Sequence, residues 1–308
     1  MTITQKIKTK ALSLGFDVVG ITSARPLEKD FHFFKWWLDK GYAADIQYMY
    51  KKQERRENPH HILEEVQSII CCGMNYYTKP SQQKISNYAW GDDYHDILLE
   101  KLKQLSNFMK EELSLNIQTK EYVDTGAILE RSYAAQAGLG WIGKNTCLIN
   151  KEKGSYLFLG EILTDLTLDY DKPVLDHCGT CTACLDACPT QAFPRPGVLD
   201  STKCISYWTL EYKGENFPKE VEKKIGNHIV GCDICQDVCP WNSKVKVSKE
   251  TSFYPRKDFN NPPLETWQYM TESDFRENFR KSPLKRLKLK GLMRNIKNAL
   301  RNQHEHRK

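Results

Sequence analysis

Eleven cysteines stand in this 308-residue chain, and eight of them fall between positions 178 and 239. The first four, from Cys178 to Cys188, follow the spacing C-x2-C-x2-C-x3-C-P, which is typical of loops that hold a [4Fe–4S] cluster. A second run ends in the same Cys-Pro pair at Cys239 but lacks a first cysteine, because Ile229 occupies that place. Cys204 lies between the two runs and supplies a replacement thiol. The pattern therefore predicts two complete [4Fe–4S] sites.

The grouping of these thiols follows from the way two-cluster ferredoxins exchange a ligand, since the fourth cysteine of a run binds the other cluster. One predicted site takes Cys178, Cys181, Cys184 and Cys239. The other takes Cys188, Cys204, Cys232 and Cys235. A zinc ribbon is the alternative for paired cysteines, but it explains neither the three-residue gaps nor the Cys-Pro endings. Two clusters form an electron relay, so we expect the substrate to react outside this segment.

The other three cysteines and the composition bear on where the protein works. An apolar fraction of 40% and a charged fraction of 27% are those of an ordinary soluble protein. No apolar run approaches the about 20 residues that a spanning helix needs, and the first residues lack a signal peptide. We therefore expect a cytoplasmic protein with no membrane contact, where clustered cysteines hold metal more often than disulfides. Cys71, Cys72 and Cys147 lie in apolar strand-like contexts and are predicted to be buried structural thiols.

The elements that must position the cysteine segment are predicted from hydrophobic periodicity. The first 170 residues alternate helical and strand patterns, as an α/β domain does. Helices are expected at 4–14, 31–38, 94–109 and 127–137, and strands at 16–21, 66–74, 121–123 and 156–163. Asp171-Lys172-Pro173 breaks this pattern. The predicted domains are an α/β domain at 1–170, a two-cluster ferredoxin-like domain at 171–245 and a basic helical extension at 246–308. The overall fold class is thus α+β or α/β.

The C-terminal extension concentrates positive charge. Residues 281–308 contain ten Lys or Arg against one Glu, a net +9, which leaves −3 for the rest of a chain whose total is +6. An amphipathic helix is expected there, with Leu289, Leu292 and Ile296 among its apolar face. Its charged face is either solvated or meets a polyanionic partner.

Several segments, taken together and in order, resemble the epoxyqueuosine reductase family over nearly the whole chain. They are residues 54–59, 75–77, 88–95, 123–126, 129–131, 137–146, 158–162, 204–211, 231–236 and 239–242. The words Gly140-Trp141-Ile142-Gly143-Lys144-Asn145 and Gly231-Cys232-Asp233-Ile234-Cys235-Gln236 are specific when found together.

The resemblance implies a fold, a cofactor and a reaction. Members of that family join a nitroreductase-like cobalamin domain to a two-cluster domain and are related to reductive dehalogenases. They bind base-off cobalamin between these parts and reduce epoxyqueuosine, at the wobble position of tRNA anticodons, to queuosine. By its place in Val123-Asp124-Thr125-Gly126, Asp124 matches the family's proton donor. That role would need a pKa raised by burial. From the residues alone, a loop aspartate bonding its own backbone is the alternative.

Further cofactor contacts follow from the same resemblance. Asp124, Gly143, Lys144, Asn145 and Gly160 are expected to lie against the cobalamin. The glycine-rich word suits a close approach of backbone to a flat macrocycle, although it also fits a tight turn. Arg56 is a further candidate, because its guanidinium suits an amide or phosphate, with a solvated surface arginine as the alternative.

The implied partners are tRNAs with a GUN anticodon (those for Tyr, His, Asn and Asp) and a low-potential electron donor such as ferredoxin or flavodoxin. Many family members continue into a helical-repeat domain that helps to grip tRNA, and this chain ends at Lys308. We expect the basic helix to contact phosphate instead, and the protein to be a monomer.

Two other functions remain open from the sequence. A reductive dehalogenase-like enzyme acting on a small molecule would share both cofactors but would have no use for the basic end. A plain electron-transfer subunit would leave the first 170 residues without a cofactor.

Overall fold

The computed structural model describes residues 1–78 and 84–305. Its centre is a four-stranded sheet in the order β1-β2-β6-β3, in which every neighbouring pair is antiparallel. The strands are β1 (Val18–Ser23), β2 (Ser68–Asn75), β3 (Thr119–Tyr122) and β6 (Leu157–Thr164). The expected mixture of helices and sheet is confirmed, and the strand directions make this domain α+β. Alternating patterns reveal the elements but not the direction in which a long connection returns the chain.

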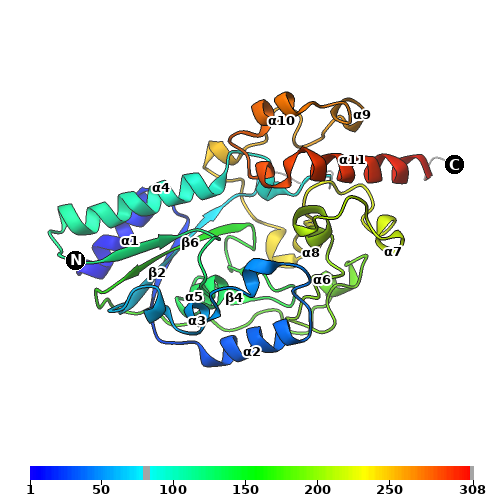
Figure 1. Cartoon of the computed structure of the whole chain (residues 1–308). Coiled ribbons are helices and arrows are strands. Elements are labelled where there is room, and N and C mark those ends of the chain that lie inside the picture. Colours follow the sequence, from blue (N-terminus) through cyan, green and yellow to red (C-terminus); the bar gives the residue numbers. More distant parts are fainter. Residues whose placement is uncertain (79–83, 306–308) are drawn as a thin grey trace.

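Helices cover both faces of the sheet (Figure 1). On one face lie α1 (Ile3–Ser13) and α4 (Tyr94–Asn107), and on the other lies α5 (Glu130–Gln136). Helices α2 (Glu28–Asp39) and α3 (Gln53–Glu57) pack against one another beyond α5. All eight predicted elements are present, with ends displaced by a few residues.

The central strand β2 explains why both faces need cover. All of its residues are buried, and its apolar run leaves no side for water. Cys71 and Cys72 are adjacent in it, so their side chains enter the cores on opposite faces. Their predicted burial is confirmed.

The cysteine segment wraps along the edge of this domain on short elements. A two-stranded hairpin of β4 (Trp141–Ile142) and β5 (Leu148–Ile149) precedes it in the chain. The segment itself holds α6 (Ala183–Asp186), α7 (Lys219–Glu222) and α8 (Ile234–Asp237). Helices α6 and α8, one from each cysteine run, lie against one another. Two π-helical segments stand at Phe108–Glu112 and Tyr207–Glu211, and 3-10 turns at Gln47–Met49, Pro59–His61, Asn87–Ala89, Pro240–Asn242, Thr251–Phe253 and Pro283–Leu287.

The C-terminal residues build a second hydrophobic core. Helices α9 (Leu264–Trp267), α10 (Glu272–Phe279) and α11 (Lys288–Glu305) pack around it. Trp90 from the first domain and Ile229 from the cysteine segment contribute to the same core, each 0% exposed. This core thus draws residues from all three predicted domains, and the two boundaries between those domains stay a prediction. Among the helices of the described residues, none has the length and apolar character needed to cross a bilayer.

Candidate active site and cluster sites

Four of the predicted cluster ligands line one cavity of about 260 Å³. Its walls include Cys178, Cys181, Cys184 and Cys239. Trp241 also lines this cavity, and the indole N–H of Trp141 donates to the Cys178 Sγ at 3.4 Å. This set of soft thiols around one space fits a [4Fe–4S] cluster. In the described part of the chain no three Cys, His, Asp or Glu side chains gather closely enough for a single metal ion. A cubane holds its thiolates farther apart than one ion does.

The other four predicted ligands also come together. Cys204 lies near Cys188, and Cys232 lies near both. Cys235 neighbours Cys232 and Cys204. The structure thus brings a thiol from between the two runs to the place that the second run leaves empty. Cluster binding by these particular residues stays a prediction.

The hairpin turn at residues 143–147 connects the sheet domain to both cysteine runs. The ammonium group of Lys144 donates to the carbonyls of Gly179 and Cys181 at 2.7 and 2.8 Å. The amide of Asn145 donates to the Cys235 carbonyl at 3.2 Å. Lys144 and Asn145 therefore hold one cluster loop each, and their contact with cobalamin stays a prediction.

Cys147 differs from what its sequence context indicated. It lies in the same turn, and its thiol meets the thiol of Cys235, a predicted cluster ligand. Cys147 was predicted to be a buried structural thiol, but the residue is only partly buried, and the hairpin turns its side chain toward the cysteine segment.

Three more expected cofactor contacts have structural roles of their own. Arg56 is buried and donates to the carbonyls of Lys51 and Tyr48 at 2.8 and 3.4 Å, so it is not the solvated arginine weighed as the alternative. A Cβ at Gly143 would come within 2.4 Å of the Ile149 side chain. A Cβ at Gly160 would meet the Leu102 side chain at 2.9 Å. A side chain at either glycine would therefore require its neighbour to shift, and cobalamin contact by these three residues stays a prediction.

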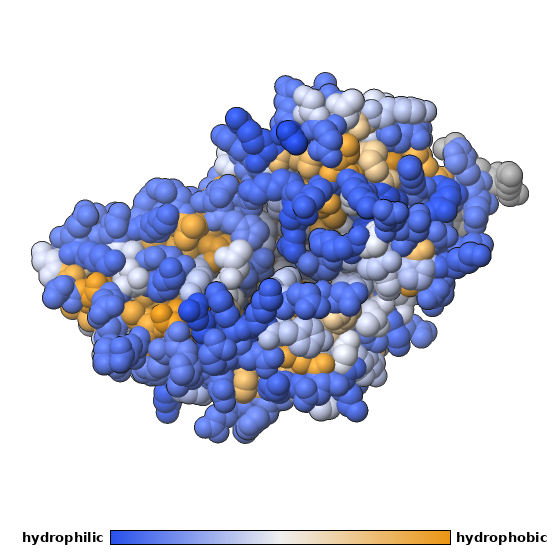
Figure 2. All heavy atoms as spheres, viewed as in Figure 1, coloured by the Kyte–Doolittle hydropathy of each residue, from blue (hydrophilic) through white to orange (hydrophobic). Residues whose placement is uncertain are grey.

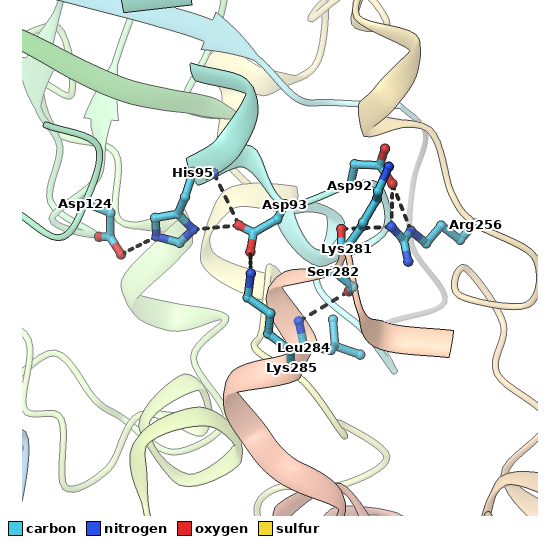
Figure 3. A network of polar contacts seen from close by, with 9 residues as sticks. All are labelled: Asp92, Asp93, His95, Asp124, Arg256, Lys281, Ser282, Leu284 and Lys285. Atoms are coloured by element: carbon cyan, nitrogen blue, oxygen red, sulfur yellow. Dashed lines mark hydrogen bonds and ion pairs between the residues drawn. The ribbon is translucent and has the colours of Figure 1, made fainter. Parts of the chain in front are cut away.

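Asp124 stands at the start of the loop between β3 and α5. Its backbone is left-handed, with φ +57°, and Thr125 N–H closes a tight turn onto the Val123 carbonyl at 2.5 Å. The side chain does not bond back to its own backbone. Instead Oδ2 lies 3.3 Å from Nε2 of His95, on the first turn of α4 (Figure 3). The side chain of Asp124 is 51% exposed, so a ligand can reach it.

His95 is held from its other side. Its Nδ1 lies 2.7 Å from Oδ1 of Asp93, whose side chain is 4% exposed (Figure 3). The other oxygen of Asp93 accepts from Lys285 at 2.7 Å. Asp93 is also the N-cap of α4, and the His95 ring stacks on Tyr94 with 4.0 Å between centroids. The His95 ring therefore has a fixed orientation between two carboxylates. The sequence did not identify His95 as a partner of Asp124.

This pairing decides the charge of both groups. For Asp124, burial raises the pKa, but the hydrogen bond and the positive charge of His95 outweigh it and leave the pKa below its usual value. For His95, burial lowers the pKa, and hydrogen bonds to Asp124 and Asp93 raise it from 6.5 to about 9. In the free protein near neutral pH, the proton thus resides on His95 and Asp124 is a carboxylate. The raised pKa that the proton-donor role requires is not present in this state.

Aromatic and charged residues surround the pair. Tyr48, Tyr88, Glu211 and Arg286 interact electrostatically with one another or with Asp124. Arg286, from the turn before α11, forms an ion pair with Glu211. The C-terminal extension therefore reaches the active site. Figure 2 shows this largely hydrophilic face hollowed between the sheet domain and the part that carries α11.

The basic extension is less positive than its composition indicated. Lys285, Arg286, Lys290 and Arg301 pair with acids of the body. Arg294 is buried, where it donates to the carbonyls of Trp208, Tyr212 and Gly214. Much of the +9 charge is thus matched by acids of the preceding residues. A groove of about 770 Å³ along α11 still contains exposed basic groups, among them Lys297.

Two sets of four thiols, beside an α+β domain that carries an exposed carboxylate, define an iron–sulfur oxidoreductase. Residues 177–242 match the family model of a 4Fe-4S double cluster binding domain. Residues 56–125 match that of epoxyqueuosine reductase QueG, DUF1730. The curated epoxyqueuosine reductase of Cellulophaga algicola is 43% identical over 94% of this chain and 95% of its own. The chain belongs to the epoxyqueuosine reductase family.

Two solved structures have the same fold. An epoxyqueuosine reductase with an epoxyqueuosine-modified tRNA-Tyr stem loop superposes with a TM-score of 0.90 at 32% identity, covering 97% of this chain and 80% of the other. The Bacillus subtilis epoxyqueuosine reductase, described with its catalytic loop swung out of the active site, gives 0.87 at 32% identity, covering 97% and 81%.

Proposed function

We propose that this protein reduces epoxyqueuosine in the tRNA anticodon to queuosine, with Asp124 as the proton donor. Family membership supports the reaction, and a related enzyme has been solved with an epoxyqueuosine-modified tRNA stem loop. The observation that carries the proposal is Asp124 itself. It is half-exposed, lies 3.3 Å from a protonated histidine, and belongs to the domain that packs on both predicted cluster sites.

The reaction fixes what the protein must deliver. Converting an epoxide to an alkene and water consumes two electrons and two protons. The eight cysteines of residues 178–239 would hold two [4Fe–4S] clusters, which would supply the electrons singly from a low-potential donor such as ferredoxin or flavodoxin. Base-off cobalamin, when bound, supplies the reductive chemistry at the C–O bond. The tyrosines and the Arg286–Glu211 pair around Asp124 fit a large flat ring with amide side chains.

The first proton comes from the His95–Asp124 pair. In water the charged pair is favoured, as the pKa of each group shows. When substrate and cofactor displace water from Asp124, burial favours the neutral pair, and the proton moves from Nε2 of His95 to Oδ2 of Asp124. Asp124 is then a carboxylic acid that protonates the epoxide oxygen as the C–O bond breaks. Asp93 and Lys285 keep the His95 ring in place for this transfer.

The tRNA backbone would meet the exposed basic residues near α11. Lys281, Lys288 and Lys297 are exposed and stand on or beside this helix. Contacts of this kind position a tRNA without reading its sequence. Selection of GUN anticodons, a cytoplasmic location and a monomeric state belong to the same proposal.

The decisive experiment measures tRNA nucleosides by mass spectrometry in cells lacking this protein, where epoxyqueuosine should accumulate and queuosine should disappear. In vitro, anaerobically purified protein should hold about eight irons and bind cobalamin. D124N should retain both cofactors and lose turnover, because asparagine tolerates the left-handed backbone but cannot donate the proton. D258N is the matched control, since Asp258 is also left-handed, with φ +68°, but lies in a C-terminal loop. Turnover by D124N would remove Asp124 from the mechanism.

A further inference from the structure

A carboxyl group is buried in the middle of the sheet, beneath the loop between β3 and α5 that carries Asp124, here called the catalytic loop. Glu161 of β6 is 0% exposed and lies between Cys71 of β2 and Tyr122 of β3 in the strand register. Among the described residues, no donor group hydrogen-bonds to either of its carboxyl oxygens. An ionised carboxylate in such a place would be strongly unfavourable.

The group that faces Glu161 is a second carboxyl, that of Glu130, the first residue of α5. Two carboxyl groups can hydrogen-bond only when one of them carries a proton. Burial and the neighbouring acid raise the pKa of Glu161 well above its usual value, so Glu161 is the protonated member and donates to Glu130.

Glu130 also touches the catalytic loop. Its Oε1 accepts the backbone N–H of Asp124 at 3.0 Å. A row of contacts therefore runs from the sheet through both carboxyls to the backbone of the proton donor.

We propose that Glu161 and Glu130 share a proton and together hold the catalytic loop by the Asp124 N–H, which makes both of them positioning residues. The proposal deepens the proposed function and rests on it only in treating Asp124 as the proton donor. The left-handed backbone of Asp124 is a conformation that a non-glycine residue keeps only when its surroundings enforce it. The hydrogen bond to Glu130 supplies that constraint, and the loop of the B. subtilis relative is described in a position outside its active site.

The strength of this contact depends on pH. Burial and the charge of Asp124 raise the pKa of Glu130 to about 7. The charged or titratable groups that interact with the pair are Asp124, Arg131, Tyr94, Cys71 and Cys72. Below about pH 7 the carboxyls of Glu130 and Glu161 are both neutral. Above it Glu130 is a charged acceptor that receives both the Glu161 O–H and the Asp124 N–H, and the loop is held more tightly.

Hydrogen exchange of the peptide that contains Asp124 tests the contact in the holoenzyme. E130A removes the acceptor, and exchange at the Asp124 amide should accelerate at least about tenfold at about pH 8. E161L removes the O–H that Glu161 donates to Glu130, and it should also accelerate exchange at the Asp124 amide. E161Q replaces the O–H with an amide N–H and should keep the loop protected. This rescue by the conservative variant separates positioning from simple loss of packing.

E121Q is the matched control. Glu121 precedes Tyr122 on β3 and pairs with Ile162, on the opposite face of the same sheet, where it accepts from Ser106. Its loss should leave loop exchange and turnover unchanged. Infrared spectra should show a protonated carboxyl in the wild type at about pH 8 that disappears in E161Q.

The outcomes separate the two proposals. Unchanged exchange in E130A, or no protonated carboxyl in the wild type, would overturn the shared-proton contact even if D124N is inactive. Accelerated exchange in E130A together with an active D124N would support the contact and refute the role of Asp124 in proton transfer.

Discussion

The substitution D93N tests whether His95 feeds the proton to Asp124. Asparagine is as good an N-cap as aspartate, so α4 should keep its start. His95 would lose one of the two carboxylates that raise its pKa from 6.5 to about 9, a difference worth about 3 kcal/mol. The two contribute through similar hydrogen bonds, at 2.7 Å and 3.3 Å. Because burial still lowers the pKa of His95 in D93N, the loss of one carboxylate removes more than half of the net rise, and we expect the pKa to fall to about 7.5.

The sign of the effect on rate follows from the protonated fraction. At about pH 8 wild-type His95 is about 90% protonated, and in D93N it would be about 25% protonated, so the single-turnover rate should fall about fourfold. At about pH 6 both proteins are protonated and the rates should agree. The assay is single-turnover reduction of epoxyqueuosine-tRNA across the pH range, with excess enzyme and reductant. NMR of isotope-labelled histidine gives the pKa of His95 directly, assigned with H95Q.

D92N is the control, because Asp92 is the adjacent carboxylate and pairs with Arg256 rather than His95 (Figure 3). It should leave both the pKa of His95 and the pH profile in place. A D93N enzyme whose alkaline limb does not move, while the NMR pKa does, would refute proton supply through His95.

Three further outcomes are expected. C204S should lower the iron content from about eight to about four per chain and leave the cluster at Cys178 spectroscopically intact, which iron analysis and electron paramagnetic resonance would show; loss of both clusters would contradict the grouping. R294M should destabilise the protein by about 2–4 kcal/mol in chemical unfolding, because it leaves three carbonyls of residues 208–214 without their donor, and a neutral result would argue against that anchoring role. The double substitution K288Q/K297Q should weaken tRNA binding and reduce the slope of log affinity against log salt by about 1–2, while the rate at saturating tRNA stays the same; an unchanged slope would place the tRNA elsewhere.

In the cysteine segment, local sequence alone was enough to predict the grouping of the cluster ligands. Thiol spacing along the chain restricts which cysteines can surround one cluster, and the gap at Ile229 indicates Cys204 as the replacement ligand. The structure places these residues in the two predicted groups. The helices and strands could also be predicted from the sequence, because hydrophobic periodicity over a few residues indicates which face of an element is buried.

The roles of individual polar residues could be predicted from the sequence only in part. Asp124 was found by its resemblance to a family motif, but His95 lies 29 residues earlier, and nothing in that separation indicates a contact. Lys144 and Asn145 stand in a glycine-rich word that fitted a macrocycle contact, and the hairpin directs them to the cysteine loops. Glu161 stands within an apolar strand pattern, and only the packing of α5 on β6 places its carboxyl against Glu130.

The sequence by itself therefore determined the iron–sulfur chemistry, the main elements and the family of this protein. The tertiary structure alone decided the charge of Asp124, the partner of Glu161 and the neutralisation of much of the basic extension by distant acids. The physical reason is the separation along the chain between the groups that interact. Cluster ligation and periodicity depend on neighbours in the chain, whereas a pKa or an ion pair depends on groups that only folding brings within a few ångströms.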